Sequence, residues 1–210
     1  MDVQYEILVA FITSVFILAI SPGPDNLFVL MQSMVNGVKQ GFAVVLGLMT
    51  GCIIHTTLVA FGVSVLIKES DILFLIIKIF GAGYLFFLAF KVYRGSASIE
   101  LSEKEMPKKS FIMLFRQGFL MNVLNPKVSI FFLAFFPGFL FSNTISEFIQ
   151  FYILGFLFIL ISFIVFGLIA LLAGRISSFI KTNKQVGVIL KWTQVTVFIG
   201  IGIFILLSEK

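Results

Sequence analysis

Six long apolar runs constrain the fold of this chain more than any other feature of its sequence. About 20 apolar residues are needed to cross the roughly 30 Å hydrocarbon core of a bilayer as a helix. None of the runs alternates with the period of two that barrel strands require. The sequence therefore predicts an all-α integral membrane protein with six transmembrane helices. We place the spans at approximately 7–35, 42–67, 72–90, 118–141, 148–173 and 188–207.

The composition supports a membrane protein and excludes several other classes. Of the 210 residues, 60% are hydrophobic and 12% are charged, whereas ordinary soluble domains carry about 25% charged residues. So few polar side chains do not cover a water-facing surface. The lone cysteine, Cys52, and the lone histidine, His55, give no internal disulfide framework, no thiol-pair redox relay and no metal cluster. A phosphate-binding loop is also absent from the sequence, so we expect no ATP hydrolysis, metal or cofactor.

The basic residues predict the orientation in the membrane. Lysines and arginines concentrate in the connections between spans one and two, three and four, and five and six, which places these connections in the cytoplasm and both termini outside. Because they are scattered rather than gathered in a stripe, we expect no nucleic-acid partner. We expect one transmembrane domain over 1–210, with repeat one at about 1–95, a cytoplasmic loop at about 91–117 and repeat two at about 110–210. The cytoplasmic basic residues are Lys39, Lys91, Arg94, Lys104, Lys108, Lys109, Arg116, Arg175, Lys181, Lys184 and Lys191, against Lys68 and Lys210 outside.

The first span is interrupted by the segment 21–26, Ser-Pro-Gly-Pro-Asp-Asn. Pro22, Gly23 and Pro24 remove backbone donors and prevent a continuous helix, which leaves carbonyls that need partners inside the membrane. We expect Asp25 or Asn26 to cap a second half-helix from Leu27 to about Val35. A simple proline kink does not explain two prolines beside a carboxylate. Because an ionisable residue in a membrane is costly, we favour a functional break.

The fourth span is interrupted by the segment 122–127, Asn-Val-Leu-Asn-Pro-Lys. Asn125 is a good N-cap and Pro126 fits the first position of a new helix. The positive end of that helix, with Lys127 beside it, suits a carboxylate. Asn122 adds a second amide. The alternative is that Lys127 extends to the cytoplasmic interface.

Both breaks fall in the first helix of a three-helix half. Since each half has an odd number of spans, we expect the halves to be two inverted repeats, and broken helices at matching positions of such repeats indicate the central site of a transporter. Strict correspondence would start the fourth span near Lys109 and bury Arg116. The symmetry is therefore approximate, or that segment lies at the interface.

Three other features carry weaker signals. Gly47, Gly51 and His55 share one face of the second span, where we expect the glycines to allow close helix packing. His55 fits a buried packing role and a proton-sensitive role equally well. Lys78, in the third span, either pairs with Asp25 or the substrate, or extends toward the outer interface.

Together these motifs resemble the LysE/RhtB family of bacterial amino-acid exporters, along the whole chain. The resemblance implies efflux of amino acids from the cytoplasm across the bacterial inner membrane, driven by the proton gradient. Lone Cys52 departs from the related electron carriers that use a cysteine pair. The matching elements are Ser21-Pro22-Gly23-Pro24-Asp25, the series Gly47, Gly51, His55 and Gly62, the stretch Lys78 to Leu85, Gly118-Phe119, Asn122 to Lys127 and Phe136-Pro137.

We therefore expect a secondary transporter, not an enzyme, whose partners are an amino acid, protons and the lipid bilayer. The substrate-binding candidates are Asp25, Asn26, Asn122, Asn125 and Lys127. Asp25 and His55 are the candidates for proton coupling. The alternatives are an exporter of another small metabolite or a cation, and a structural or assembly subunit without transport activity. A homo-oligomer is compatible with the sequence.

Overall fold

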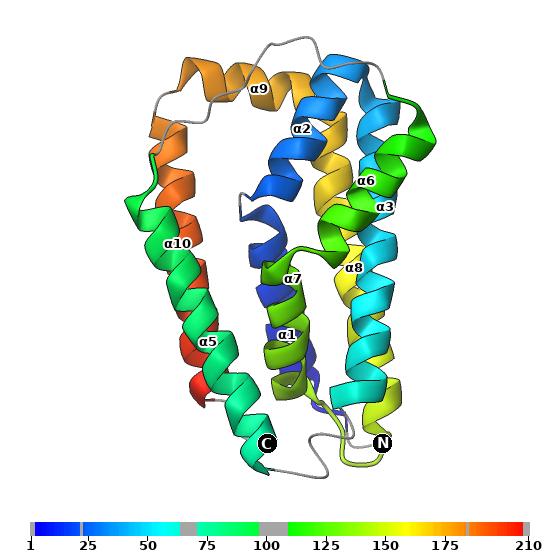
Figure 1. The fold of residues 1–210 in the computed structure, drawn as a ribbon, viewed down its shortest axis with the longest axis vertical. Helices are drawn as coiled ribbons and strands as arrows, with labels where there is room; N and C mark the ends of the chain where they lie inside the picture. The colour runs from blue at the N-terminus through cyan, green and yellow to red at the C-terminus, as the bar shows by residue number, and fades with distance from the viewer. Residues whose placement is uncertain (1–2, 22, 64–70, 97–108, 184, 208–210) are drawn as a thin grey trace.

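The computed structural model describes residues 3–21, 23–63, 71–96, 109–183 and 185–207. Within these ranges the chain is all-helical, without a strand, and most helices run along the long axis of an elongated bundle (Figure 1). Helix α1 (Tyr5–Ile20) begins and helix α10 (Gln185–Leu207) ends at the same end of it. The prediction of an all-α fold is confirmed.

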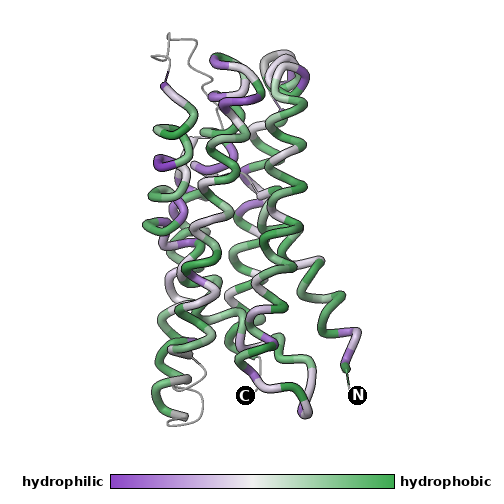
Figure 2. Tube along the Cα trace, turned by 90° about the vertical axis from the view of Figure 1, so that its right-hand side faces the viewer, coloured by the Kyte–Doolittle hydropathy of each residue, from purple (hydrophilic) through white to green (hydrophobic). Residues whose placement is uncertain are grey.

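Within the described ranges, four helices are long and apolar enough to cross a bilayer unbroken. They bear large apolar side chains on their outer faces, and apolar residues follow most of their length (Figure 2). In a membrane such faces contact lipid rather than water. These spans are α3 (Val38–Leu58) with the first residues of the π-helix η1 (Val59–Val63), α5 (Asp71–Arg94), α8 (Glu147–Leu171) and α10 (Gln185–Leu207).

Two further spans are broken, as the sequence predicts. The chain direction bends by 57° at the break of the first pair and by 49° at the break of the second pair. Counting each bent pair as one span gives up to six spans among the described residues, which agrees with an integral membrane protein. The inverted relation of the two halves stays a prediction. The first pair is α1 (Tyr5–Ile20) with α2 (Pro24–Asn36), and the second is α6 (Phe111–Val123) with α7 (Pro126–Ile130), η2 (Phe131–Phe135) and η3 (Phe136–Phe139).

The structure corrects the predicted boundaries at two connections. The fourth span begins at Phe111 rather than near residue 118, because the Ser110 side chain caps α6 by accepting a hydrogen bond from the backbone of Met113 (3.4 Å). Arg116 is nevertheless exposed. The connection between the last two spans contains the helix α9 (Ala173–Thr182), which lies across the end of the bundle (Figure 1). Residues 64–67 of the predicted second span lie outside the described residues.

Glycines allow α3 and α6 to pack backbone to backbone. A Cβ at Gly47 would collide with the carbonyl oxygen of Phe115, and one at Gly118 would collide with the carbonyl oxygen of Val44. At Gly51 an added Cβ would lie 2.5 Å from the side-chain oxygen of Asn122. The predicted packing role of Gly47 and Gly51 is confirmed, and the contact of Gly51 brings α3 against the second break.

Candidate functional site

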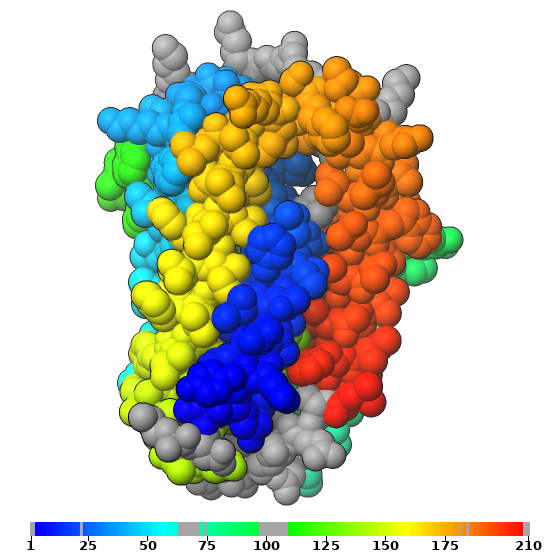
Figure 3. All heavy atoms as spheres, turned by 180° about the vertical axis from the view of Figure 1, so that it is seen from behind, coloured from blue at the N-terminus to red at the C-terminus, as the bar shows by residue number. Residues whose placement is uncertain are grey.

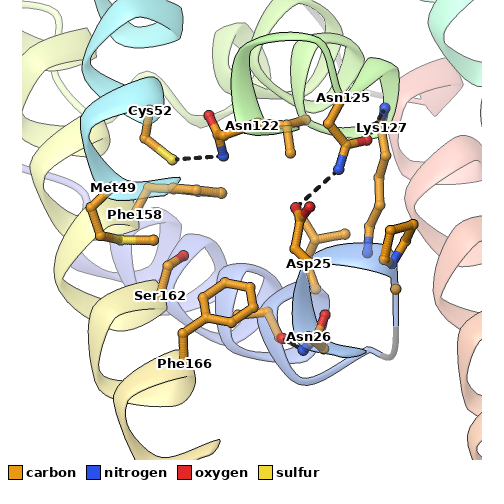
Figure 4. A pocket seen from close by; sticks show the side chains of 15 residues that line it. Asp25, Asn26, Met49, Cys52, Asn122, Asn125, Lys127, Phe158, Ser162 and Phe166 are labelled. Atoms are coloured by element: carbon orange, nitrogen blue, oxygen red, sulfur yellow. Dashed lines mark hydrogen bonds between the residues drawn. The ribbon is translucent and has the colours of Figure 1, made fainter. Parts of the chain in front are cut away.

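The two helix breaks meet in the middle of the bundle. Asn125 donates a hydrogen bond from Nδ2 to Oδ2 of Asp25 over 3.0 Å, although the two residues are 100 positions apart (Figure 4). The Asp25 side chain is 8% exposed. A buried carboxylate is costly unless polar partners surround it, so this contact makes both breaks parts of one site.

The first break is built differently from the prediction. Helix α2 begins at Pro24, and the N-cap is Gly23 in an extended conformation, rather than Asp25 or Asn26. Proline is favourable at this position because it has no N–H to leave unpaired. Asp25 therefore lies in the first turn, where the helix dipole favours its negative charge. Pro22 lies outside the described residues.

The side chain of Asn26 provides a hydrogen-bond donor for the last turn of α1. Its Nδ2 donates a hydrogen bond to the carbonyl oxygen of Ala19 over 2.7 Å. That carbonyl is one of those that the break frees from helical hydrogen bonding. Asn26 thus supports the break, and it also lines the cavity next to Asp25.

The second break follows the prediction closely. Asn125 is the N-cap of α7, and its Oδ1 accepts a hydrogen bond from the backbone N–H of Lys127 (3.1 Å). Pro126 occupies the first helical position. Because Oδ1 caps α7 and Nδ2 holds Asp25, a single amide side chain joins the two breaks.

Lys127 extends toward the first break (Figure 4). Its ammonium lies 5.2 Å from the ring centre of Phe198 on α10, and 3.7 Å from the point that a Cβ on Gly23 would occupy. The carboxylate of Asp25 is held by Asn125 rather than by an ion pair with Lys127. A buried acid and a half-buried base therefore lie on the same cavity, which both line.

Asn122 connects α3 to the second break. Its Nδ2 lies 3.4 Å from Sγ of Cys52, while Nε2 of His55 lies 3.2 Å from the Asn122 backbone oxygen. The ring of His55 also stacks on Phe132. Among the described residues, the side-chain oxygen of Asn122 is buried without a hydrogen-bond partner, and it packs against Gly51 of α3.

The breaks enclose a cavity of about 40 Å³. A water needs about 10–15 Å³ of such space, so the cavity accommodates a few waters, and an amino acid requires the surrounding side chains to move. All five substrate-binding candidates line it, whereas His55 and Lys78 do not. Its lining consists of Leu18, Ala19, Gly23, Pro24, Asp25, Asn26, Met49, Cys52, Asn122, Asn125, Lys127, Val128, Phe158, Ser162 and Phe166.

Lys78 is buried on α5, away from this lining. The Asp25 carboxylate accepts a hydrogen bond from Asn125, and a pairing of Lys78 with Asp25 or with the substrate stays a prediction. In the part of the chain that is described, no three His, Cys, Asp or Glu side chains come together to hold a metal ion.

The sequence did not predict that α8 forms one wall of the cavity. Phe158, Ser162 and Phe166 lie on one face of α8 and line the cavity. One usable signal was present, since Ser162 is a buried hydroxyl within a strongly apolar span. Phe198, which faces Lys127, gave no such signal.

Comparison with known proteins identifies the family. The chain is 33% identical over 181 residues to a homoserine/homoserine lactone efflux protein of Salmonella typhi, covering 86% of this chain and 87% of that protein. It is 32% identical, with the same coverage, to the protein of that name from Salmonella typhimurium strain LT2. No solved structure matches significantly. The family model of LysE type translocators matches residues 16–209, so the chain belongs to the LysE family of translocators.

Proposed function

We propose that this protein exports homoserine, its lactone or closely similar amino-acid derivatives across the bacterial inner membrane, in exchange for protons. Two relatives at 32% and 33% identity are named for homoserine and homoserine lactone efflux. The observation that carries the proposal is the hydrogen bond between Asp25 and Asn125, which gathers an acid, three amides and Lys127 around one cavity.

The two sides of the cavity suit the two ends of an amino acid. In the proposal, Asp25 binds the ammonium group of the substrate. Lys127, together with the start of the helix that Asn125 caps, faces the carboxylate. Homoserine lactone keeps the ammonium but has an ester in place of the carboxylate. Asp25 is therefore the contact common to both substrates.

Proton coupling follows if the ammonium and a proton compete for Asp25. A protonated Asp25 does not attract the ammonium, so substrate leaves as the proton binds. One charge moving through 100 mV supplies about 2.3 kcal/mol, and 1.4 kcal/mol corresponds to a factor of ten. Inward movement of one proton thus suffices to drive accumulation by more than tenfold. His55 is a second candidate, connected to the site through the backbone of Asn122.

Transport also requires access from each side in turn. Phe158 lines the cavity and packs against Phe131, Phe132 and Phe136, at ring-centre distances of 5.5, 4.8 and 6.1 Å. In the proposal, these rings form the barrier on the side of the chain termini, and the barrier opens when Phe158 separates from the other three. In the proposal, that side faces the outside of the cell and the α9 side faces the cytoplasm, in line with the positive-inside rule.

The proposal is tested with Asp25→Asn in proteoliposomes that carry an imposed pH gradient. Wild-type protein is expected to accumulate labelled homoserine against its gradient, whereas the variant is expected to lose gradient-driven accumulation. The matched control is Asn183→Asp at the exposed C-terminal end of α9, which changes charge away from the cavity and should retain activity. Normal gradient-driven accumulation by Asp25→Asn would contradict the coupling role.

A further inference from the structure

A second and larger cavity opens beside the first break. It has a volume of about 330 Å³ and lies between α1, α2, α8, α9 and the first turns of α10. The hollow between these helices is visible in Figure 3. An engineered cavity of about 150 Å³ in another protein takes up benzene. This space is therefore large enough for a longer apolar group.

The walls of this cavity are unsuited to water. Among the described residues that line it, Asn26 is the one polar side chain, and its amide group already donates to the carbonyl of Ala19. A water needs two to four polar partners to be stable in a cavity. Leaving the space empty would also deprive the surrounding side chains of dispersion contacts.

The cavity runs from the lipid-facing surface into the bundle. At its rim, Phe16, Ile20 and Leu168 are 49%, 49% and 50% exposed. At its inner end, Leu30 and Val165 are buried. Because α8 and α10 are membrane spans, the exposed rim faces hydrocarbon. The apolar groups that surround the rim there are the acyl chains of the lipids.

We propose that one acyl chain of a bilayer phospholipid occupies this cavity. The headgroup would lie at the α9 end, since α9 crosses that end of the bundle and supplies Ile176 and Ile180 to the cavity wall. A linear, flexible hydrocarbon chain fits an apolar space that is open to the membrane.

The acyl chain has a structural role for the site. Leu27 and Leu30 lie in the first two turns of α2, directly after Asp25, and they line the second cavity. An acyl chain packed against them supports the half-helix that carries Asp25 from the side opposite Asn125. This inference rests on the membrane location and does not depend on which substrate is exported.

Native mass spectrometry of the purified protein tests the inference. Wild-type protein, released from a mild detergent, is expected to retain one phospholipid per chain. Leu168→Trp should fill the cavity and reduce phospholipid occupancy several-fold. Leu171→Trp is the control, because Leu171 lies one turn further along α8, is 57% exposed and does not line the cavity; it should retain the lipid.

Three outcomes would overturn the proposal. Equal phospholipid occupancy in Leu168→Trp and Leu171→Trp would show that the lipid binds elsewhere. If the only bound species had the mass of the detergent, the cavity would not bind phospholipid specifically. Displacement of the adduct by added homoserine would assign the cavity to the substrate. If Leu168→Trp does not fold, Ile176→Trp and its control Phe179→Trp on α9 apply the same test, because Ile176 lines the cavity and Phe179 does not.

Discussion

At each break, backbone groups lose their helical hydrogen bonds, and the two breaks cap or satisfy these groups with different residues. At the first break, Gly23 caps α2 without a side chain, and Asn26 reaches back seven residues to the freed carbonyl of Ala19. At the second break, Asn125 caps α7 itself and its amide group extends to Asp25. The first break thus presents an acid, and the second presents an amide and a base. The difference is what gives one cavity two chemically distinct ends.

Among substitutions of the residues that surround Asp25, Asn125→Ala should have the largest effect. It removes the cap of α7, worth about 1 kcal/mol, and the partner of a buried carboxylate, worth about 1–3 kcal/mol. We expect homoserine export in proteoliposomes to fall by at least about tenfold. Ser129→Ala is a suitable control, because the Ser129 hydroxyl donates to the backbone oxygen of Asn125 and not to its side chain. Equal export activity of the two variants would show that transport does not depend on the contact between the two breaks.

Lys127→Met should distinguish the two ends of the site by substrate. The variant keeps an unbranched, flexible side chain that is one atom shorter, and it removes the charge that faces the carboxylate. A charge-assisted hydrogen bond contributes about 1.5–3 kcal/mol, so we expect affinity for homoserine to fall by roughly tenfold or more. Homoserine lactone, without a carboxylate, should lose much less. Equal losses for both substrates, measured by binding to purified protein, would contradict the assignment.

Asn26→Ala should act on stability more than on recognition. It leaves the carbonyl of Ala19 without its side-chain donor, at a cost of about 1–3 kcal/mol, and lowers the melting temperature in detergent. Asn36→Ala is the comparison, because Asn36 bonds another side chain, Gln32, at the far end of the same half-helix. A melting temperature lowered more by Asn36→Ala would show that Asn26 is not essential to the break.

Phe198→Leu should have the smallest effect. It removes the ring beneath the Lys127 ammonium, a contact worth about 0.5–2 kcal/mol, and keeps an apolar side chain in α10. Freed from the ring, Lys127 should bind homoserine as well as wild type or slightly more tightly. The affinity for the lactone should not change. A homoserine affinity lowered as much as in Lys127→Met would mean that Phe198 positions the base rather than competing for it.

Local chemistry made the second break predictable. Asn125 and Pro126 are adjacent, and the preferences of N-cap and first-turn positions depend on a few neighbouring residues. The same reasoning was wrong for the first break, where two prolines around Gly23 offered more than one helix start. The structure selects the start at Pro24.

Contacts between distant helices were harder to predict. Helices such as α8 are apolar on nearly every face, so their sequence does not indicate which side faces the cavity; Phe158 and Phe166 were missed for this reason. The contact between Asp25 and Asn125 was expected only as proximity within one site. Helix α9 was missed because ten residues among basic ones resemble a loop.

The most direct test of the central claim is a side-chain exchange across the two breaks. Asp25→Asn alone should weaken homoserine binding by more than about tenfold. Adding Asn125→Asp returns a carboxylate to the cavity, keeps a side-chain oxygen to cap α7, and lets the new amide at position 25 donate to that carboxylate. If the two breaks form one site, the dissociation constant of the double variant, measured by calorimetry, recovers to within about tenfold of wild type. A double variant that binds homoserine as weakly as Asp25→Asn would contradict the claim.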